Sequence, residues 1–243
     1  MKEDIEKIVK DIIDTSFEVA DIETIPDLED SRLTFYNKGL RFEATTLYID
    51  MRGSTKILNK HNRRSVAKLH KAYFHIIVKI AKSLGGEVRS FNGDGMLVFF
   101  QGTTKITLSN AVISAMKMKY MITQNKEITK KLEKYSSIDF GIGIDDGEIL
   151  CTKVGLAGTN NRDLVWISNA VNKSVKIGDN LKSPYHIGIS SYVYSNLTDS
   201  AKYAKKIDSY GNETTVDMWS SAYFTYNDNQ EIYYYTRYHW AVS

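Results

Sequence analysis

A tight turn near the middle of the chain constrains its fold more than any other feature. Gly93, Asp94 and Gly95 separate two short apolar runs at residues 87–92 and 96–100. Asp-Gly between apolar runs is a strong short-range signal for a β-hairpin. We therefore predict two paired strands that place Asp94 at the edge of a sheet, where its carboxylate can meet a ligand.

A second aspartate lies at a second strand end. Asp50 follows the apolar run 42–49 and precedes Gly53, and Ser54 and Thr55 then offer N-caps for a helix. A carboxylate beside a helix start is suited to holding a divalent ion against a phosphate. Alone, Asp50 would be an ordinary cap and Asp94 an ordinary turn residue. Together they could share a pair of metal ions, an arrangement that performs phosphoryl chemistry.

The order of the apolar segments predicts an α+β fold. A strand at 42–49 and a long helix at 66–84 precede the hairpin, and Gly85-Gly86 ends the helix. Through residue 144 the order is βαββαβ, the ferredoxin-like pattern. The expected elements after the hairpin are a helix at 108–118, strands at 138–144 and 148–154 with a turn between them, a helix at 170–177 and a strand at 186–189.

Both ends of the chain extend this core. Residues 1–20 carry apolar side chains at helical spacing, and the acidic stretch that follows contains Pro26. We therefore predict an N-terminal helix and linker at 1–40 and one domain at 41–243. The tyrosine-rich tail predicts an additional C-terminal β segment. Helices should cover one face of the sheet, and a second subunit could cover the other.

Composition excludes several classes of protein. A net charge of +3 over 243 residues does not point to nucleic acid. Cys151 is the only cysteine, so no internal disulfide can form and a reducing compartment is expected. The apolar runs are far shorter than the roughly 20 residues of a membrane span. The charged N-terminus has no signal-peptide pattern, and we expect a cytoplasmic protein.

Over residues 42–190 these segments resemble the class III nucleotide cyclase catalytic domain. The resemblance rests on the stretch 49–55 (Ile-Asp-Met-Arg-Gly-Ser-Thr), Gly85-Gly86, the turn 93–95 and Val171-Asn172. Each piece is common by itself, but the set is specific in this order and spacing. The resemblance implies a cyclase catalytic domain within 41–243.

The resemblance also implies roles for single residues. Asp50, Asp94 and the carbonyl of Met51 would bind two Mg²⁺ or Mn²⁺ ions, and Asn172 would orient the ribose. Lys176 stands where the family usually has a phosphate-binding arginine, and a lysine supplies charge without a bidentate fork. The phosphates would lie against the backbone N–H groups of Arg52, Gly53, Ser54 and Thr55.

In this family the active site forms between two chains. One subunit would supply Asp50 and Asp94, and its partner would supply Asn172 and Lys176. The resemblance therefore implies a homodimer with two sites. Lys202, Lys205 and Lys206 are candidates for a further triphosphate contact that cannot be aligned to the family.

Two departures from the family concern the base of the nucleotide. Ser90 stands where purine cyclases carry Lys or Glu, and Val165 stands where they carry Asp or Cys. A site without matched polar partners should discriminate purines poorly. Ser168 also replaces an expected glycine. We take Ser90, Asn92 and Val165 as the candidate base pocket, with Ser90 and Asn92 on one strand face.

These departures, together with Arg41 and the segment 48–52, most resemble the pyrimidine cyclases of Pycsar anti-phage defence. That resemblance implies conversion of UTP or CTP to cyclic UMP or cyclic CMP and pyrophosphate, and a separate effector protein that the product activates. Two alternatives stay open. One is an adenylate or guanylate cyclase with atypical base contacts, and the other is a catalytically decayed nucleotide-binding module.

Overall fold

The computed structural model describes residues 1–208 and 211–242. The helices are α1 (Lys2–Asp14), α2 (Ser54–Lys60), α3 (Arg63–Ser83), α4 (Lys105–Thr123), α5 (Lys126–Leu132), α6 (Asn169–Asp179), α7 (Ser191–Ser195) and α8 (Asp199–Lys202). The strands are β1 (Glu18–Asp21), β2 (Lys38–Arg52), β3 (Gly86–Asn92), β4 (Gly95–Gln101), β5 (Asp139–Gly155), β6 (Arg162–Ile167), β7 (Ile187–Ser190), β8 (Tyr203–Ile207), β9 (Glu213–Asp217), β10 (Ser220–Tyr226) and β11 (Asn229–Thr236).

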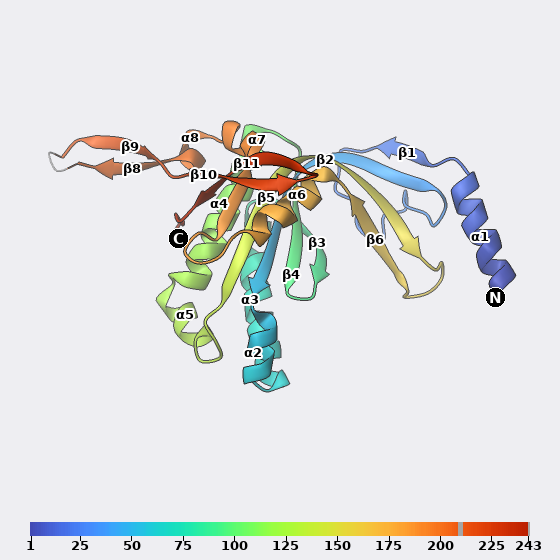
Figure 1. Cartoon of the computed structure of the whole chain (residues 1–243), viewed down its shortest axis with the longest axis horizontal. Coiled ribbons are helices and arrows are strands. Elements are labelled where there is room, and N and C mark those ends of the chain that lie inside the picture. Colours follow the sequence, from blue (N-terminus) through green and yellow to red (C-terminus); the bar gives the residue numbers. More distant parts are fainter. Residues whose placement is uncertain (209–210, 243) are drawn as a thin grey trace.

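A mixed nine-stranded sheet forms the centre of the molecule (Figure 1). Its main path runs β10-β11-β7-β5-β2-β4-β3, while β1 pairs with β2 and β6 pairs with β5. The four strands β5-β2-β4-β3, with the helices between them, have the ferredoxin-like order, so the predicted α+β fold is confirmed. The predicted C-terminal β segment is also present as β8 to β11.

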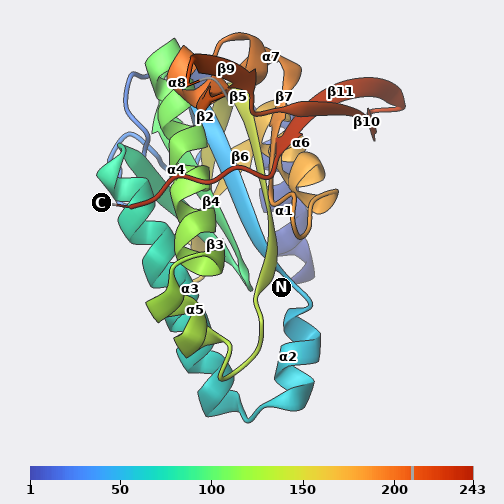
Figure 2. The same ribbon diagram turned by 90° about the vertical axis from the view of Figure 1, so that its left-hand side faces the viewer.

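One face of the sheet is covered by α3 and α4 (Figure 2). On α3, Leu69, Tyr73 and Ile77 recur at helical spacing and are fully buried. From the sheet, Val98 and Phe100 alternate on β4 and face the same cluster. The main core therefore arises where a helical period of apolar residues meets a strand period.

The chain itself covers much of the opposite face. Leu40, Phe42 and Phe99 are buried there against the segment between β1 and β2 and against residues of α6. Arg89 of β3 holds that segment against the sheet, because its guanidinium donates hydrogen bonds to the carbonyls of Ile25 and Pro26. Residues 22–33 thus serve as a strap over the sheet, and a second subunit is not the sole cover of this face.

Three local predictions were wrong. The stretch 145–147 is not a turn but part of β5, because β2 is long enough to pair with β5 on both sides of Gly147, from Asp139 to Asp146 and from Glu148 to Thr152. The helix predicted over residues 1–20 ends at Asp14, and Glu18–Asp21 form a strand, β1, which pairs in parallel with the start of β2. Finally, the N-cap of α2 is Gly53 and no side chain caps this helix, because the left-handed backbone at Gly53 turns the chain into it.

In the described part of the chain, no helix is both long enough and apolar enough to cross a membrane. The helix α1 extends from the end of the molecule that carries β1 and β6 (Figure 1). None of its residues is buried.

Candidate active site

Strand pairing brings the two aspartates together. Asp50 near the end of β2 pairs with Gly95 of β4, and Asp94 directly precedes Gly95 in the hairpin turn. A side chain at position 95 has no room, because its Cβ would lie 2.7 Å from the Tyr48 hydroxyl and 2.9 Å from Asp50 Oδ1. The Gly93 backbone has a φ of 63°, which turns the hairpin. The turn glycines therefore allow two carboxylates to meet.

The electrostatics around these carboxylates suit a bound cation. Burial raises the pKa of Asp50, and the negative charge of Asp94 raises it further. Arg52 opposes this rise, with Nη1 at 3.4 Å from Asp50 Oδ2. Oxygen ligands of this kind are the ones that Mg²⁺ and Mn²⁺ prefer. The negative charge of Asp50 is unfavourable in this half-buried place beside Asp94. A divalent ion bound between the two carboxylates would offset that cost.

The Arg52 side chain has a role that the sequence did not reveal. Its guanidinium donates to the carbonyls of Gly178 and Leu181 and lies 3.3 Å from the Asp179 carboxylate. It therefore joins the end of β2 to the C-terminal end of α6. The sequence pattern drew attention to the backbone amide of Arg52, and no local signal indicated the partner of its side chain.

The start of α2 opens onto the same region. The first helical hydrogen bond runs from the Lys56 N–H to the Gly53 carbonyl, so the amides of Ser54 and Thr55 precede the bonded part of the helix. A cleft of about 360 Å³ is lined by Ser54, Thr55, Leu58, Val66, His70, Gly93 and Asp94. The predicted metal ligand Asp94 and the predicted phosphate cradle therefore share one cleft, and His70 is an additional lining residue.

Two of the predicted base-pocket residues lie on this face of the sheet. Ser90 and Tyr48 both pair with Leu97, so their side chains point to the same side as Asp50. The Ser90 hydroxyl donates to Asn92 Oδ1 at 3.1 Å, which confirms that Ser90 and Asn92 share a face. The Tyr48 hydroxyl hydrogen-bonds to Asp50, and burial raises the pKa of Tyr48 to about 12.

Val165 lies far from the aspartates within one chain. It pairs with Thr152, which pairs with Gly39 at the start of β2. Asp50 is 11 residues further along β2, and at about 3.3 Å per residue this is about 36 Å. Within one chain, this predicted base contact therefore lies far from the predicted metal site.

Asn172 is also separated from the aspartates. It lines a cleft of about 400 Å³ with Glu148, and Glu148 pairs with Glu43, 7 residues before Asp50. That interval is about 23 Å of strand. Lys176 lies one helical turn after Asn172, and both side chains are exposed on α6. The same exposed face ends at Asp179, whose carboxylate lies 3.3 Å from the Arg52 side chain beside Asp50, so only the C-terminal end of α6 approaches its own chain's aspartates.

Glycine contacts fix the position of α6 on the sheet. A Cβ at Gly143 would lie 1.8 Å from the Ser174 carbonyl oxygen, and one at Gly141 would lie 2.2 Å from the Gly178 carbonyl oxygen. Ile177 of α6 is fully buried and packs in one cluster with residues of β10 and β11. The helix that carries Asn172 is therefore held against β5 at backbone distance.

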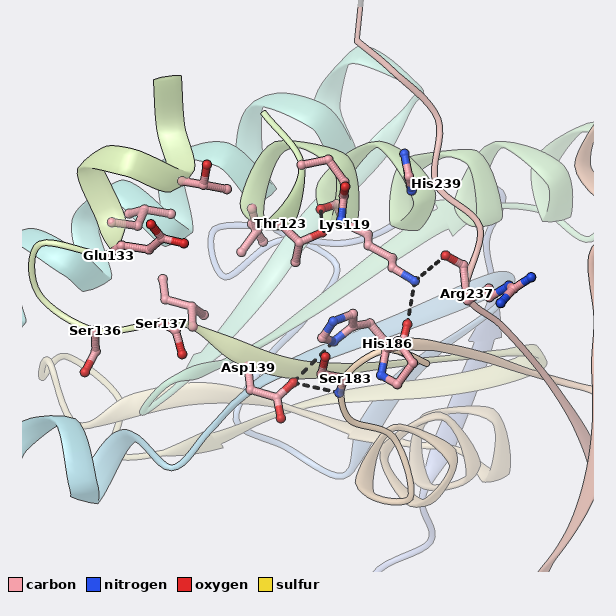
Figure 3. Close-up of a pocket in the computed structure, with 16 residues that line it drawn as sticks. Lys119, Thr123, Glu133, Ser136, Ser137, Asp139, Ser183, His186, Arg237 and His239 are labelled. Carbon is pink, nitrogen blue, oxygen red and sulfur yellow. Dashed lines mark hydrogen bonds and ion pairs between the residues drawn. The ribbon is translucent and has the colours of Figure 1, made fainter. Parts of the chain in front are cut away.

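A separate cleft of about 560 Å³ lies between α4, α5 and the start of β5 (Figure 3). Lys119 is buried there and donates to the carbonyls of Pro184 and Arg237 at 2.8 and 2.7 Å. His186 stacks on Phe140 and hydrogen-bonds to its carbonyl oxygen. Of the predicted site residues in the described chain, none lines this cleft, and its polar groups join chain segments to one another.

The three candidate triphosphate lysines lie at the edge of the molecule. Lys202 Nζ lies 4.0 Å from the centre of the Tyr194 ring. Lys205 pairs with Glu213 across the β8–β9 hairpin, which projects away from the sheet (Figure 1). The structure does not bring these lysines to Asp50 within one chain.

A ferredoxin-like sheet, paired carboxylates at a strand end and hairpin turn, and a helix start beside them define a nucleotide cyclase fold. The sequence profile of the adenylate and guanylate cyclase catalytic domain matches residues 40–237. The chain belongs to this family of nucleotide cyclases.

Several proteins similar to this chain are named uridylate or cytidylate cyclases. A uridylate cyclase from Xanthomonas perforans is 30% identical over 96% of this chain and 95% of its own length. A uridylate cyclase from Burkholderia cepacia is 29% identical over 90% of this chain and 93% of its own. A cytidylate cyclase from Staphylococcus aureus is 26% identical over 56% of this chain and 36% of its own.

Solved structures show the same fold at greater distance. The crystal structure of an adenylyl cyclase from P. aeruginosa has a TM-score of 0.64 at 18% identity, covering 82% of this chain and 95% of that protein. A guanylyl cyclase structure has a TM-score of 0.63 at 20% identity, and the match covers 81% of this chain and 91% of that protein. These likenesses confirm the arrangement of strands and helices.

Proposed function

We propose that the protein is a uridylate cyclase that converts UTP to cyclic UMP and pyrophosphate, with CTP as the alternative substrate. The face that Asp50 shares with Ser90 and Asn92 carries this proposal. It combines a cation site with short polar side chains where purine cyclases place Lys or Glu. The uridylate cyclases that resemble this chain support a pyrimidine substrate.

The proposed reaction closes a ring on one nucleotide. The ribose 3′-oxygen forms a bond to the α-phosphorus, the bond from the α-phosphorus to the bridging oxygen breaks, and pyrophosphate leaves. Asp50, Asp94 and the Met51 carbonyl would hold two Mg²⁺ or Mn²⁺ ions. When bound, these ions lower the pKa of the 3′-hydroxyl and neutralise phosphate charge. The amides of Ser54 and Thr55 would bind phosphate oxygens in the adjoining cleft.

We further propose that each active site is assembled from two chains. In one chain, neither Asn172 nor Lys176 lines the cleft that holds Asp94, and Val165 lies about 36 Å along the sheet from Asp50. A second copy in the opposite orientation would bring all three to the nucleotide. In that arrangement Asn172 orients the ribose and Lys176 contacts a phosphate as a point charge.

The proposed product is a signal. The resemblance of the sequence to pyrimidine cyclases of anti-phage defence supports a role in which infection triggers synthesis and a separate effector responds to the cyclic nucleotide. Expression of this chain with its genomic neighbours during phage challenge tests that role. Protection should require Asp50, and equal protection by Asp50→Ala would contradict it.

The substrate is tested by incubating the purified chain with each of the four ribonucleoside triphosphates and Mn²⁺. Mass spectrometry then identifies the products. We expect cyclic UMP, or cyclic CMP, in large excess over cyclic AMP and cyclic GMP. Purine products alone would replace the proposal with a purine cyclase. Nucleotide binding without any product would indicate a decayed cyclase.

A further inference from the structure

The hydroxyl of Tyr73 is a buried polar group that lacks a hydrogen-bond partner. Tyr73 lies on α3, and its side chain is fully buried in the main core. No residue in the described part of the chain forms a hydrogen bond with its hydroxyl oxygen. Leaving a buried hydroxyl unpaired costs free energy, and such a group in a native fold points to a catalytic role or to a bound ion.

Packing alone does not account for this hydroxyl. The ring of Tyr73 is held in the core by a tilted contact with the Phe74 ring at 5.6 Å between centroids. A phenylalanine would fill the same apolar space without burying a polar atom. Serine and threonine hydroxyls can turn to bond the backbone of their own helix, but a tyrosine hydroxyl sits at the far end of a rigid ring and cannot. The oxygen of Tyr73 therefore needs an acceptor from another element.

The helix α3 runs beside the end of the β3–β4 hairpin that carries Asp94. His70 of α3 lines one cleft with Gly93 and Asp94. Phe74 of α3 makes an edge-to-face contact with Phe91 of β3, with 5.5 Å between ring centroids. Tyr73 lies between His70 and Phe74 on the buried side of the same helical turn. Its ring therefore lies under the end of the hairpin.

The charges of the proposed metal site act on Tyr73. Burial raises the pKa of Tyr73, and the negative charges of Asp50 and Asp94 raise it further. The hydroxyl thus keeps its proton and remains a hydrogen-bond donor. Both aspartates are close enough to the ring to influence it, in agreement with the position of α3 beside the hairpin.

The two aspartates differ in their hydrogen bonds. Asp50 accepts from the Tyr48 hydroxyl and, at 3.4 Å, from Arg52 Nη1. The Asp94 carboxylate accepts no hydrogen bond from any residue that the structure describes. An unpaired donor, Tyr73, and an unpaired acceptor, Asp94, therefore occupy the same corner of the molecule.

We propose that the Tyr73 hydroxyl donates a hydrogen bond to the Asp94 carboxylate when a divalent ion is bound, and so positions this ligand for the ion. The inference rests on the metal assignment under the proposed function and adds a positioning residue to it. In the metal-free fold the two carboxylates repel each other. An ion between them removes that repulsion, and Asp94 can then turn one oxygen to the hydroxyl. Hydrogen bonds of this kind orient ligating carboxylates.

The test is Tyr73→Phe, which keeps the ring and removes the hydroxyl. Loss of a group that orients a metal ligand weakens metal binding by about 10- to 100-fold. The dissociation constant for Mn²⁺, measured from the electron paramagnetic resonance signal of free Mn²⁺, should rise accordingly. The Tm without metal should not fall, because the variant removes a buried hydroxyl that is unpaired in that state. A hydroxyl with a merely structural role would instead lower Tm and leave the Mn²⁺ constant unchanged.

The matched control is Ser114→Ala on α4. The Ser114 hydroxyl is also fully buried and has no hydrogen-bond partner among the described residues, but Ser114 does not line the cleft with Asp94. Its removal is the same kind of change in the same core. The Mn²⁺ constant of this variant should stay within about twofold of the unaltered value, since no metal ligand loses a contact.

Turnover provides a second readout. In Tyr73→Phe the Mn²⁺ concentration for half-maximal turnover should rise by the same factor as the dissociation constant. Turnover at saturating Mn²⁺ should return to within about threefold of the unaltered rate, because the hydroxyl positions a ligand and does not contact the nucleotide. A rate that excess Mn²⁺ fails to restore would contradict this role.

The outcomes separate this inference from the proposed reaction. An unchanged Mn²⁺ constant in Tyr73→Phe overturns the inference alone and assigns the hydroxyl another partner, such as a buried water. Equal weakening by Ser114→Ala overturns it as well, since the effect would then come from the core at large. An unaltered protein that binds no Mn²⁺ overturns the metal assignment and this inference together. Mn²⁺ binding needs no nucleotide, so a purine product would leave the inference standing.

Discussion

Substituting one glycine under α6 should disable the protein without touching a predicted catalytic group. In Gly143→Ala the new Cβ would lie 1.8 Å from the Ser174 carbonyl oxygen and 2.6 Å from the Gly178 nitrogen. Because comfortable contacts begin at about 3.5 Å, α6 would have to retreat by about 1.7 Å. A misplacement of about 1 Å can cost about 100-fold in rate, so turnover should fall at least that far.

The same clash should be visible in stability. Overpacking of this kind costs about 1–3 kcal/mol, which for a chain of this size lowers Tm by about 2–12 °C. The matched control is Gly178→Ala on the helix side of the contact. Its Cβ lies 3.2 Å from the Gly143 nitrogen, and helix propensity favours alanine by up to about 1 kcal/mol. Unaltered Tm and turnover of Gly143→Ala would refute the close packing of α6 on β5.

Three further predictions concern the carboxylates. Asp50→Ala and Asp94→Ala should each abolish cyclase turnover and leave Tm within a few degrees, since the buried charge of Asp50 is unfavourable in the metal-free fold; full activity of either variant would contradict the metal assignment. Chelation with EDTA should stop turnover and added Mn²⁺ should restore it, whereas metal-independent turnover would exclude the proposed chemistry. Burial raises the pKa of Asp146 to about 7, so the folded state retains a proton that the unfolded state loses above about pH 4, and stability should fall as pH rises from about 4 to 7. Asp146→Asn should reduce that slope in urea titrations, and an unchanged slope would show that this group is not protonated in the fold.

The sequence predicted the part of the fold that local patterns encode. The hairpin at Asp94 followed from turn chemistry, and α3 and α4 followed from a helical period of apolar residues. The split of β5 into two strands was wrong because Asp145-Asp146-Gly147 has the composition of a turn. Whether such a stretch turns depends on the partner strand, and the length of β2 decides that here.

Only the part of the candidate site that lies at the end of β2 and in the β3–β4 hairpin could be predicted from the sequence. Ser90 and Asn92 share a face because strand alternation requires it, and Asp50 meets Asp94 through β2–β4 pairing. The contacts of the Arg52 side chain with Gly178, Leu181 and Asp179 join residues more than 120 positions apart in sequence. No local pattern contains such a contact, and the same holds for His70 in the cleft beside Asp94.

The claim that one site needs two chains can be measured directly by mixing two inactive variants. Asp50→Ala removes a metal ligand, and Asn172→Ala removes the proposed ribose contact supplied by the partner. In an equal mixture about half of the dimers are heterodimers, and each has one intact site, so about a quarter of unaltered turnover should return. Turnover that stays at the level of the separate variants would show that Asp50 and Asn172 do not act across a dimer interface.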